Sequence, residues 1–205
     1  MPKQTFFNLP EDKQKKLMEA ARVEFSRAPL HEASISNIIK KCGVSRGSFY
    51  QYFEDKDDAF YYLLKQYTNE RQERLMLLLD EHNGNLFEAM TIMFQQTLDR
   101  FEKEENRSYF KHVFLNMNHK IQNTMASGEK EKDFPDHLSV IQEHVDADLL
   151  QADSEKEIRH TIHLVRLLMF HTLVRHFSKG WTKEEAFETF TLELNLMRKG
   201  LEMKE

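Results

Sequence analysis

The chain has 205 residues, 31% of them charged, and a formal net charge of −5 at pH 7. This length allows one or two domains with a core of their own, and the single cysteine, Cys42, excludes an internal disulfide and the paired thiolates of a zinc finger. No run of about 18 apolar residues occurs and the first residues do not form a signal peptide, so we expect a cytoplasmic protein without membrane contact.

The composition favours helices. Six glycines and four prolines stand against 16 phenylalanines and 10 methionines, which is typical of long helices joined by few turns. We therefore predict an all-α fold. The charge is uneven, because residues 1–56 hold ten Lys and Arg against seven Asp and Glu, whereas the remaining residues hold 19 against 27. A basic N-terminal part beside an acidic remainder suits a protein whose N-terminal part binds a polyanion.

Two helices are predicted first along the chain. The first begins after Pro10 and ends near Pro29, and its apolar residues share one face: Leu17, Ala20, Ala21 and Phe25. The second is short. It begins after the N-cap candidate Ser34 and ends at Gly43, which can adopt the left-handed conformation that stops a helix.

A third helix follows within a few residues. Ser45 is its N-cap candidate, and Val44 and Phe49 have the spacing of a hydrophobic staple, which sets the direction of the helix. Two short helices joined by a turn that contains glycine form a helix-turn-helix. From the N-cap candidate Asp55, a fourth helix of about 25 residues extends to Asn83. Further helices are predicted over residues 86–105, 108–125, 135–150, 154–178 and 182–201, with a polar loop over residues 126–136.

The third helix has two different faces. Phe49 and Phe53 lie four residues apart and form the face that we expect to be buried. The opposite face carries hydrogen-bond donors, among them Arg46 and Gln51, which can pair with guanine and adenine in a major groove. Lys56, in the first turn of the fourth helix, suits a phosphate contact. A generic helical hairpin would show a similar pattern.

Residues 17–60 resemble the DNA-binding domain of the TetR family of transcriptional regulators, through "LMEAARVEF" and especially "GVSRGSFYQYFEDKDD". The resemblance implies a three-helix helix-turn-helix domain over residues 8–55. A long fourth helix then joins it to a helical bundle for ligand binding and dimerisation over residues 56–205. One departure is "RAPLHEA", where the family usually has Gly followed by an aromatic residue and where Pro29 serves as the helix stop. The family pattern implies DNA contacts by Ser34, Ser36, Ser45, Arg46, Gly47, Ser48, Tyr50, Gln51, Tyr52 and Lys56.

The same resemblance implies a homodimer whose helical C-terminal domain binds a small molecule. We predict a repressor that binds a palindromic, double-stranded DNA operator and is released by a small, apolar effector. Residues 162–177 are apolar over most of the helix circumference, which suits either a dimer contact or a central helix of one subunit. An apolar effector pocket can be lined by seven residues that equally fit a plain core: Met93, Phe94, Leu98, Phe101, Phe110, Phe114 and Met117.

Alternatives remain from other classes. Glu157 and His160 have the Glu-x-x-His spacing of di-metal bundles, but no second such pair occurs, so a di-iron site lacks ligands. A haem or single-metal sensor that uses one or two histidines stays open, as does a helical protein-interaction module that does not bind DNA. We do not expect this protein to be an enzyme or to bind a metal or a cofactor. The motifs for phosphate binding and nucleophilic catalysis are missing from the sequence, and Cys42 falls on an apolar helix face.

Overall fold

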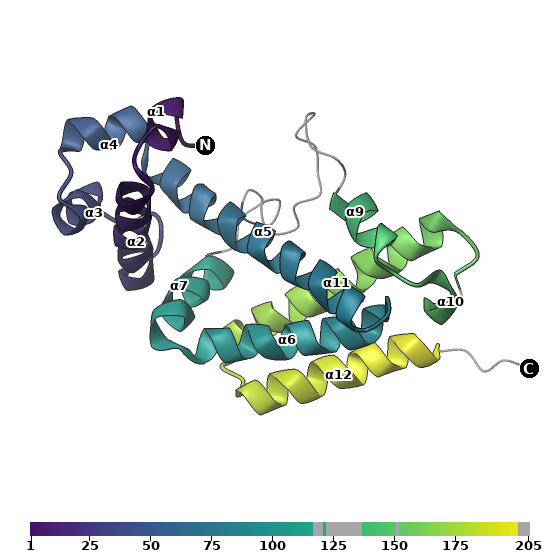
Figure 1. Cartoon of the computed structure of the whole chain (residues 1–205). Helices are drawn as coiled ribbons and strands as arrows, with labels where there is room; N and C mark the ends of the chain where they lie inside the picture. Colours follow the sequence, from purple (N-terminus) through teal and green to yellow (C-terminus); the bar gives the residue numbers. More distant parts are fainter. Residues whose placement is uncertain (117–120, 122–136, 151, 201–205) are drawn as a thin grey trace, which may run out of the picture. The chain divides into compact units, whose positions relative to one another are not determined.

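The computed structural model describes residues 1–116, 121, 137–150 and 152–200 (Figure 1). Within these ranges the regular structure is helical and contains no strand, which confirms the predicted all-α class. No helix there is long and apolar enough to span a bilayer. Contacts divide the chain into two compact units, Met1–Asn69 with Phe101–Met125, and Glu70–Arg100 with Ala126–Glu205. The functional division between residues 55 and 56 stays a prediction.

The first unit contains the predicted helix-turn-helix. Its helices are α1 (Gln4–Phe7), α2 (Glu11–Arg27), α3 (Ile35–Cys42), α4 (Arg46–Tyr52), the first part of α5 (Lys56–Glu81) and α7 (Glu104–Leu115). Helix α2 packs against α3 and α7, and α3 packs against α4. The expected order of helices is confirmed, with α1 as an addition that the sequence pattern did not reveal.

Caps explain where α3 ends and where α4 and α5 begin. Gly43 has φ of 75°, and its N–H donates to the Ile39 carbonyl at 2.9 Å, so a left-handed glycine ends α3 as predicted. The Ser45 Oγ accepts from the Ser48 N–H at 3.0 Å and caps α4. In the same way the Asp55 carboxylate accepts a hydrogen bond from the Asp58 N–H in the first turn of α5. Ser34 occupies the N-cap position of α3, but its hydroxyl makes no capping bond.

The second unit contains the rest of α5 together with α6 (Leu86–Glu102) up to Arg100, α9 (His137–Glu143), α10 (Ala147–Leu150), α11 (Glu155–Lys179) and α12 (Lys183–Lys199). Helix α11 packs against α9 and α12. Phe94 of α6 stacks on Phe190 of α12 with 4.1 Å between the ring centroids. The N-caps Ser154 and Thr182 confirm the predicted starts of the last two helices, and Thr182 forms a capping box with Glu185.

The single helix predicted over residues 135–150 is wrong. Helix α9 ends at Glu143 and α10 begins at Ala147, because the backbone of Asp146, which lies between them, forms a hydrogen bond outside α9. Its N–H donates to the Gly84 carbonyl at 3.1 Å, and its Oδ1 accepts from the Asp148 N–H at 2.9 Å. Gly84 is required there, since an added Cβ would lie 2.4 Å from the Asp146 nitrogen. The loop predicted over residues 126–136 lies outside the described residues.

A buried carboxylate joins α2 to the start of α3. Although Glu24 is charged, it lies on the buried, apolar face of α2 and is only 4% exposed. Arg27 donates to both of its oxygens, at 2.7 and 2.9 Å. The Ser34 N–H donates to it at 2.7 Å and the Asn37 amide at 3.1 Å, so Glu24 satisfies backbone and side-chain donors at the helix start. The Arg27 guanidinium lowers the pKa of Glu24 below its ordinary value, although burial acts in the opposite direction.

We predict that Glu24→Gln lowers the free energy of unfolding by about 1–3 kcal/mol at neutral pH, because it weakens a buried, charge-assisted network. The lowered pKa means that the ionised group stabilises the fold fully above its ordinary pKa of 4.5 and that this stabilisation is lost as the pH falls from there through the lowered pKa. Urea unfolding at neutral pH and at a series of pH values down to about pH 2 measures both effects.

The matched control is Glu19→Gln, on the same helix and 53% exposed beside Arg22. It should change stability by less than about 1 kcal/mol. Equal losses in both variants, or a difference between wild type and Glu24→Gln that persists in acid, would contradict the role given to Glu24.

Candidate nucleic-acid interface

Helix α4 is held by aromatic residues on one side only. Phe49 and Phe53 are both fully buried, and their ring centroids lie 5.4 Å apart. Phe53 follows the last residue of α4 in an extended conformation, rather than inside the helix as we expected. Half-buried Val44 precedes the N-cap, in the staple position relative to Phe49. These contacts decide which side of α4 faces solvent.

The solvent side carries the residues that can read a base edge. Arg46, Gly47 and Gln51 are exposed, and Tyr50 is 39% exposed. The Arg46 guanidinium lies 5.9 Å from the centre of the Tyr50 ring, within reach of a cation–π contact, so these two donors lie next to each other. A helix with such a face fits a major groove.

The serines take less uniform positions than the sequence suggested. Ser45 and Ser48 lie at the start of α4 with their hydroxyl oxygens 2.8 Å apart, so both take part in the cap. Ser36 is exposed at the start of α3, whereas Ser34 is half-buried and its N–H is bound to Glu24. Tyr52 is half-buried at the end of α4.

Lys56 has protein partners of its own. Its ammonium donates to the carbonyls of His31 and Ala33, each at 2.9 Å, and so holds the segment between α2 and α3. An ammonium has three N–H donors, which leaves one for a phosphate. The first-turn amides of α5 are less available than expected, because the Asp58 N–H is bound to Asp55. The phosphate contact of Lys56 stays a prediction.

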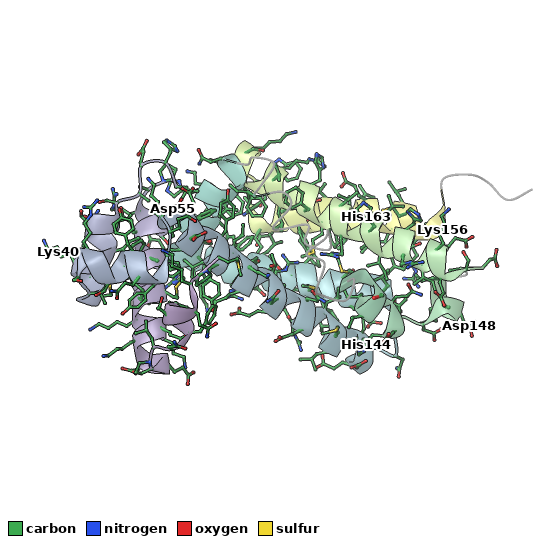
Figure 2. All side chains as sticks on the ribbon, turned by 90° about the horizontal axis from the view of Figure 1, so that it is seen from above. Lys40, Asp55, His144, Asp148, Lys156 and His163 are labelled. Atoms are coloured by element: carbon green, nitrogen blue, oxygen red, sulfur yellow. The ribbon has the colours of Figure 1, made fainter. Side chains whose placement is uncertain are left out.

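Two further cations were not singled out in the sequence. Lys40 and Lys41 are exposed in the last turn of α3, and Lys40 points away from the ribbon in Figure 2. The signal was available, since an adjacent basic pair before a helix stop suits both the negative end of the helix dipole and a DNA backbone. Lys40 and Lys41 therefore extend the donor-rich surface onto α3.

Comparison with known proteins agrees with this geometry. Residues 17–61 match the sequence model of the tetR family of bacterial regulatory proteins, and residues 85–201 match that of the tetracyclin repressor-like C-terminal domain. The chain belongs to the TetR family. The two matched parts correspond to the N-terminal helix-turn-helix and to the helical C-terminal part of the chain.

Individual HTH-type regulators resemble parts of the chain. The HTH-type transcriptional regulator YdgC of Bacillus subtilis (strain 168) is 35% identical over 74 residues, which are 36% of this chain and 38% of YdgC. The HTH-type transcriptional repressor NemR of Escherichia coli (strain K12) is 33% identical over 67 residues, 33% of this chain and 34% of NemR. The chain thus spans well under half the length of these relatives.

Solved structures show the same fold. A TetR-family regulator from Syntrophomonas wolfei aligns over 95% of this chain and 99% of its own, with a TM-score of 0.64 and 20% identity. A transcriptional regulator from Pseudomonas aeruginosa PAO1 aligns over 95% of both chains, with a TM-score of 0.61 and 14% identity. At these identities the likeness concerns the fold alone.

The residues predicted to line an effector pocket fall into two groups. Phe101, Phe110 and Phe114 lie in the first unit, where the Phe110 ring is 4.4 Å from Phe101 and 4.3 Å from Tyr67. Met93, Phe94 and Leu98 are buried on α6 in the second unit. Met117 lies outside the described residues. The pocket itself stays a prediction.

A tyrosine beside the first group was not anticipated. Tyr109 is 5% exposed, and its ring lies 5.0 Å from that of Phe110. Its hydroxyl is buried without a hydrogen-bond partner in the described part of the chain, and burial raises its pKa. A buried donor of this kind favours a ligand that offers an acceptor oxygen.

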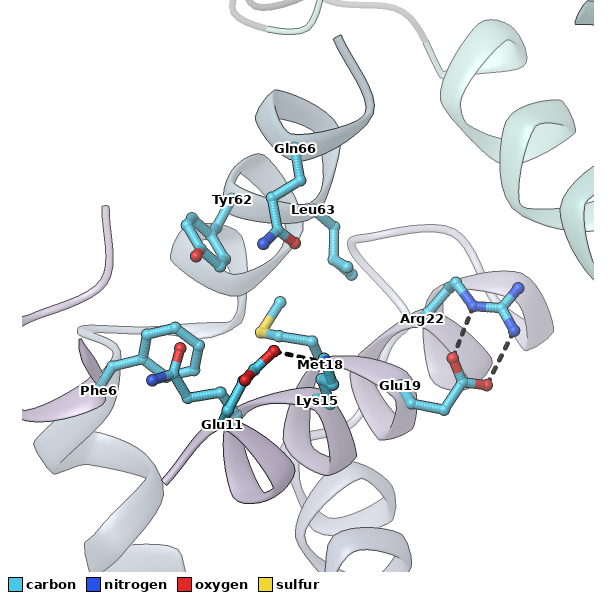
Figure 3. A pocket seen from close by; sticks show the side chains of 10 residues that line it. Phe6, Glu11, Lys15, Met18, Glu19, Arg22, Tyr62, Leu63 and Gln66 are labelled. Atoms are coloured by element: carbon cyan, nitrogen blue, oxygen red, sulfur yellow. Dashed lines mark hydrogen bonds and ion pairs between the residues drawn. The ribbon is translucent and has the colours of Figure 1, made fainter. Parts of the chain in front are cut away.

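A groove of about 470 Å³ lies between α2 and α5 in the first unit (Figure 3). Phe6, Met18, Tyr62 and Leu63 supply much of its apolar lining. Its charged groups already form ion pairs along α2: Glu11 with Lys15 at 2.6 Å and Glu19 with Arg22 at 2.8 Å. It includes none of the predicted effector residues.

The described histidines of α11 are spread along the helix rather than gathered around a metal site. His160, His163 and His171 are exposed along α11, where Figure 2 labels His163. Among the described residues no three metal-ligating side chains come together. The haem or metal alternative thus gains no support from their placement.

We predict that Gly47→Ala has opposite effects on the stability of the head and on its affinity for DNA. The Cβ of an alanine would meet only the Ser45 Oγ, at 3.8 Å, so Gly47→Ala should raise the free energy of unfolding by about 0.5–1 kcal/mol through helix propensity. Its methyl group would stand on the exposed face of α4, so DNA affinity should fall. Thermal unfolding and fluorescence anisotropy with duplex DNA measure the two effects.

Gly43→Ala is the control, and it should lower stability by about 1 kcal/mol because Gly43 has a positive φ. Unchanged DNA binding in Gly47→Ala would argue against close approach at this position.

Proposed function

We propose that this TetR-family regulator is a repressor that binds a palindromic operator as a homodimer and is released by a small, largely apolar effector. It works in the cytoplasm, where bacterial DNA lies. The observation that carries the proposal is the division of α4 into a fully buried side, with Phe49, and an exposed side with Arg46 and Gln51. The relative NemR is itself named a transcriptional repressor.

Exposed leucines support a dimer contact on α11 and α12. Leu164 and Leu167 are 52% and 46% exposed on α11, and Leu192 and Leu196 are 61% and 46% exposed on α12. The two helices pack against each other within the second unit. Large apolar side chains that gather in this way on a surface favour a partner that covers them. Two identical subunits would then present two α4 helices to a two-fold symmetric DNA site.

The inner side of α11 supports the same proposal. Ile162, Val165, Met169 and Leu173 repeat at helical spacing and are at least 97% buried within their own subunit. Helix α11 thus exposes Leu164 and Leu167 in addition to the apolar side that it buries inside the subunit.

The effector is proposed to bind near the aromatic cluster of α5, α6 and α7 in the first unit. Phe101 and Phe110 are buried there with their ring centroids 4.4 Å apart, and Tyr109 has a buried hydroxyl without a partner in the described residues. An aromatic or conjugated compound with a carbonyl or ether oxygen suits this environment. Helix α7 packs against α2 of the DNA-binding head, so a shift of α7 would move α2.

The DNA-reading roles can be tested with a duplex selected by the wild-type protein from a random-sequence pool. Arg46→Ala and Gln51→Ala should each cost roughly 1–3 kcal/mol on the selected duplex and relax the preference at one base pair. Lys56→Met should weaken all duplexes about equally and reduce the salt dependence by about one ion. Fluorescence anisotropy over a series of salt concentrations measures these changes.

Two outcomes would contradict these roles. If the wild-type protein enriches no duplex at low salt, DNA reading by α4 fails and the protein-interaction alternative gains. If Lys56→Met alters base preference while Arg46→Ala and Gln51→Ala do not, the assignment of base and phosphate contacts is wrong.

The dimer contact predicts that Leu167→Glu combined with Leu196→Glu gives a monomer, because burying two carboxylates in an apolar interface is costly. Size-exclusion chromatography with light scattering gives the mass in solution. Leu77→Glu is the matched control, since Leu77 is 54% exposed on α5 in the same unit, and this variant should remain dimeric. A dimeric double variant, or a monomeric control, would place the interface elsewhere.

A further inference from the structure

The C-terminal end of α4 is completed by a segment far away in the sequence. The last four carbonyls of any helix have no partner within that helix, and α4 has only seven residues. The Phe49 carbonyl accepts from the Phe53 N–H at 2.9 Å. This local bond leaves the carbonyls of the last three residues, Tyr50 to Tyr52, which need hydrogen-bond donors from elsewhere.

Residues 3–6 supply all three of these contacts, and we call this segment the N-terminal clamp. The Lys3 ammonium donates to the Tyr50 carbonyl at 2.9 Å, and the Lys3 N–H donates to the Tyr52 carbonyl at 2.8 Å. The Thr5 hydroxyl donates to the Gln51 carbonyl. The cation of Lys3 also lies at the negative end of the helix dipole, where it is favoured.

One aromatic ring anchors the clamp. Phe6 is fully buried, with its ring centroid 5.2 Å from Phe53 and 5.4 Å from Tyr62. Burying such a ring offsets part of the entropy that is lost when a short segment becomes ordered. The clamp is therefore held on the head by its own core contact, independently of the three bonds to α4.

We propose that Lys3 and Thr5 are positioning residues for DNA recognition, which hold the last turn of α4 in the geometry that reads bases. The proposal rests on the proposed function, in which α4 reads DNA. Gln51, a base-reading candidate, lies in this turn, and its own carbonyl is the acceptor of Thr5. A helix of seven residues is marginal without such support, so loss of these bonds frays the turn that carries Gln51.

The test uses the full chain with Thr5→Val and Lys3→Met, which remove the two side-chain bonds to α4, keep the side-chain size and leave the bond from the Lys3 N–H to the Tyr52 carbonyl in place. Thr5→Ser and Lys3→Arg are the conservative partners. Lys16→Met is the matched control, because Lys16 is an exposed lysine on α2 that bonds to no carbonyl of α4 in the described residues. Affinity is measured for the duplex selected by the wild-type protein and for a scrambled duplex of the same composition. Hydrogen exchange follows the amides of α3 and α4 in the free protein.

We expect Thr5→Val and Lys3→Met each to reduce the ratio of selected to scrambled affinity about fivefold, as the loss of one hydrogen bond implies. The conservative variants should restore the ratio, Lys16→Met should leave it unchanged, and faster exchange should be confined to α4. An unchanged ratio, or exchange that accelerates equally in α3 and α4, overturns the proposal. If the wild-type protein selects no duplex, the proposed function fails, and the exchange pattern alone decides whether the clamp holds α4.

Discussion

The burial of Phe49 is the constraint on which the rest of the DNA-binding head depends. Helix α4 is too short to persist alone, and it has a defined orientation because Phe49 and Phe53 are fully buried on one side. Rotation of α4 about its axis would expose a phenylalanine and bury Arg46, at a cost of several kcal/mol. The exposed donor face is thus a direct consequence of apolar packing beneath it.

Polar contacts then define details that apolar packing leaves open. Glu24 accepts a hydrogen bond from the Ser34 N–H and so fixes the start of α3 relative to α2. Lys56 donates to two carbonyls of the segment that connects these helices. At the other end of the head, Lys3 and Thr5 satisfy carbonyls of α4. Directional bonds of this kind give a short helix one geometry, which recognition of base edges requires.

The two units use their aromatic and aliphatic residues differently. In the first unit, Phe101 and Phe110 form a cluster with Tyr67, beside the buried hydroxyl of Tyr109. In the second unit, α11 buries Ile162 on one side and exposes leucines on the other. Similar apolar composition therefore serves a core, a proposed effector site and a proposed subunit interface, and the composition alone does not separate these roles.

Local chemistry made much of this architecture predictable from sequence. Ser45, Asp55 and Thr182 each bind an amide three residues ahead, and Gly43 ends α3 through its own φ, so the caps and the helix-turn-helix follow from neighbouring residues. Contacts between distant residues required the tertiary structure. Thr5 and Gln51 are 46 positions apart, and Lys56 and His31 are 25 apart, so no local pattern indicated that they meet. The break before α10 arises likewise from a bond between Asp146 and Gly84. Helix positions depend on short-range periodicity and capping, whereas the partners of Lys56, Glu24 and α4 depend on which elements the folded core brings together.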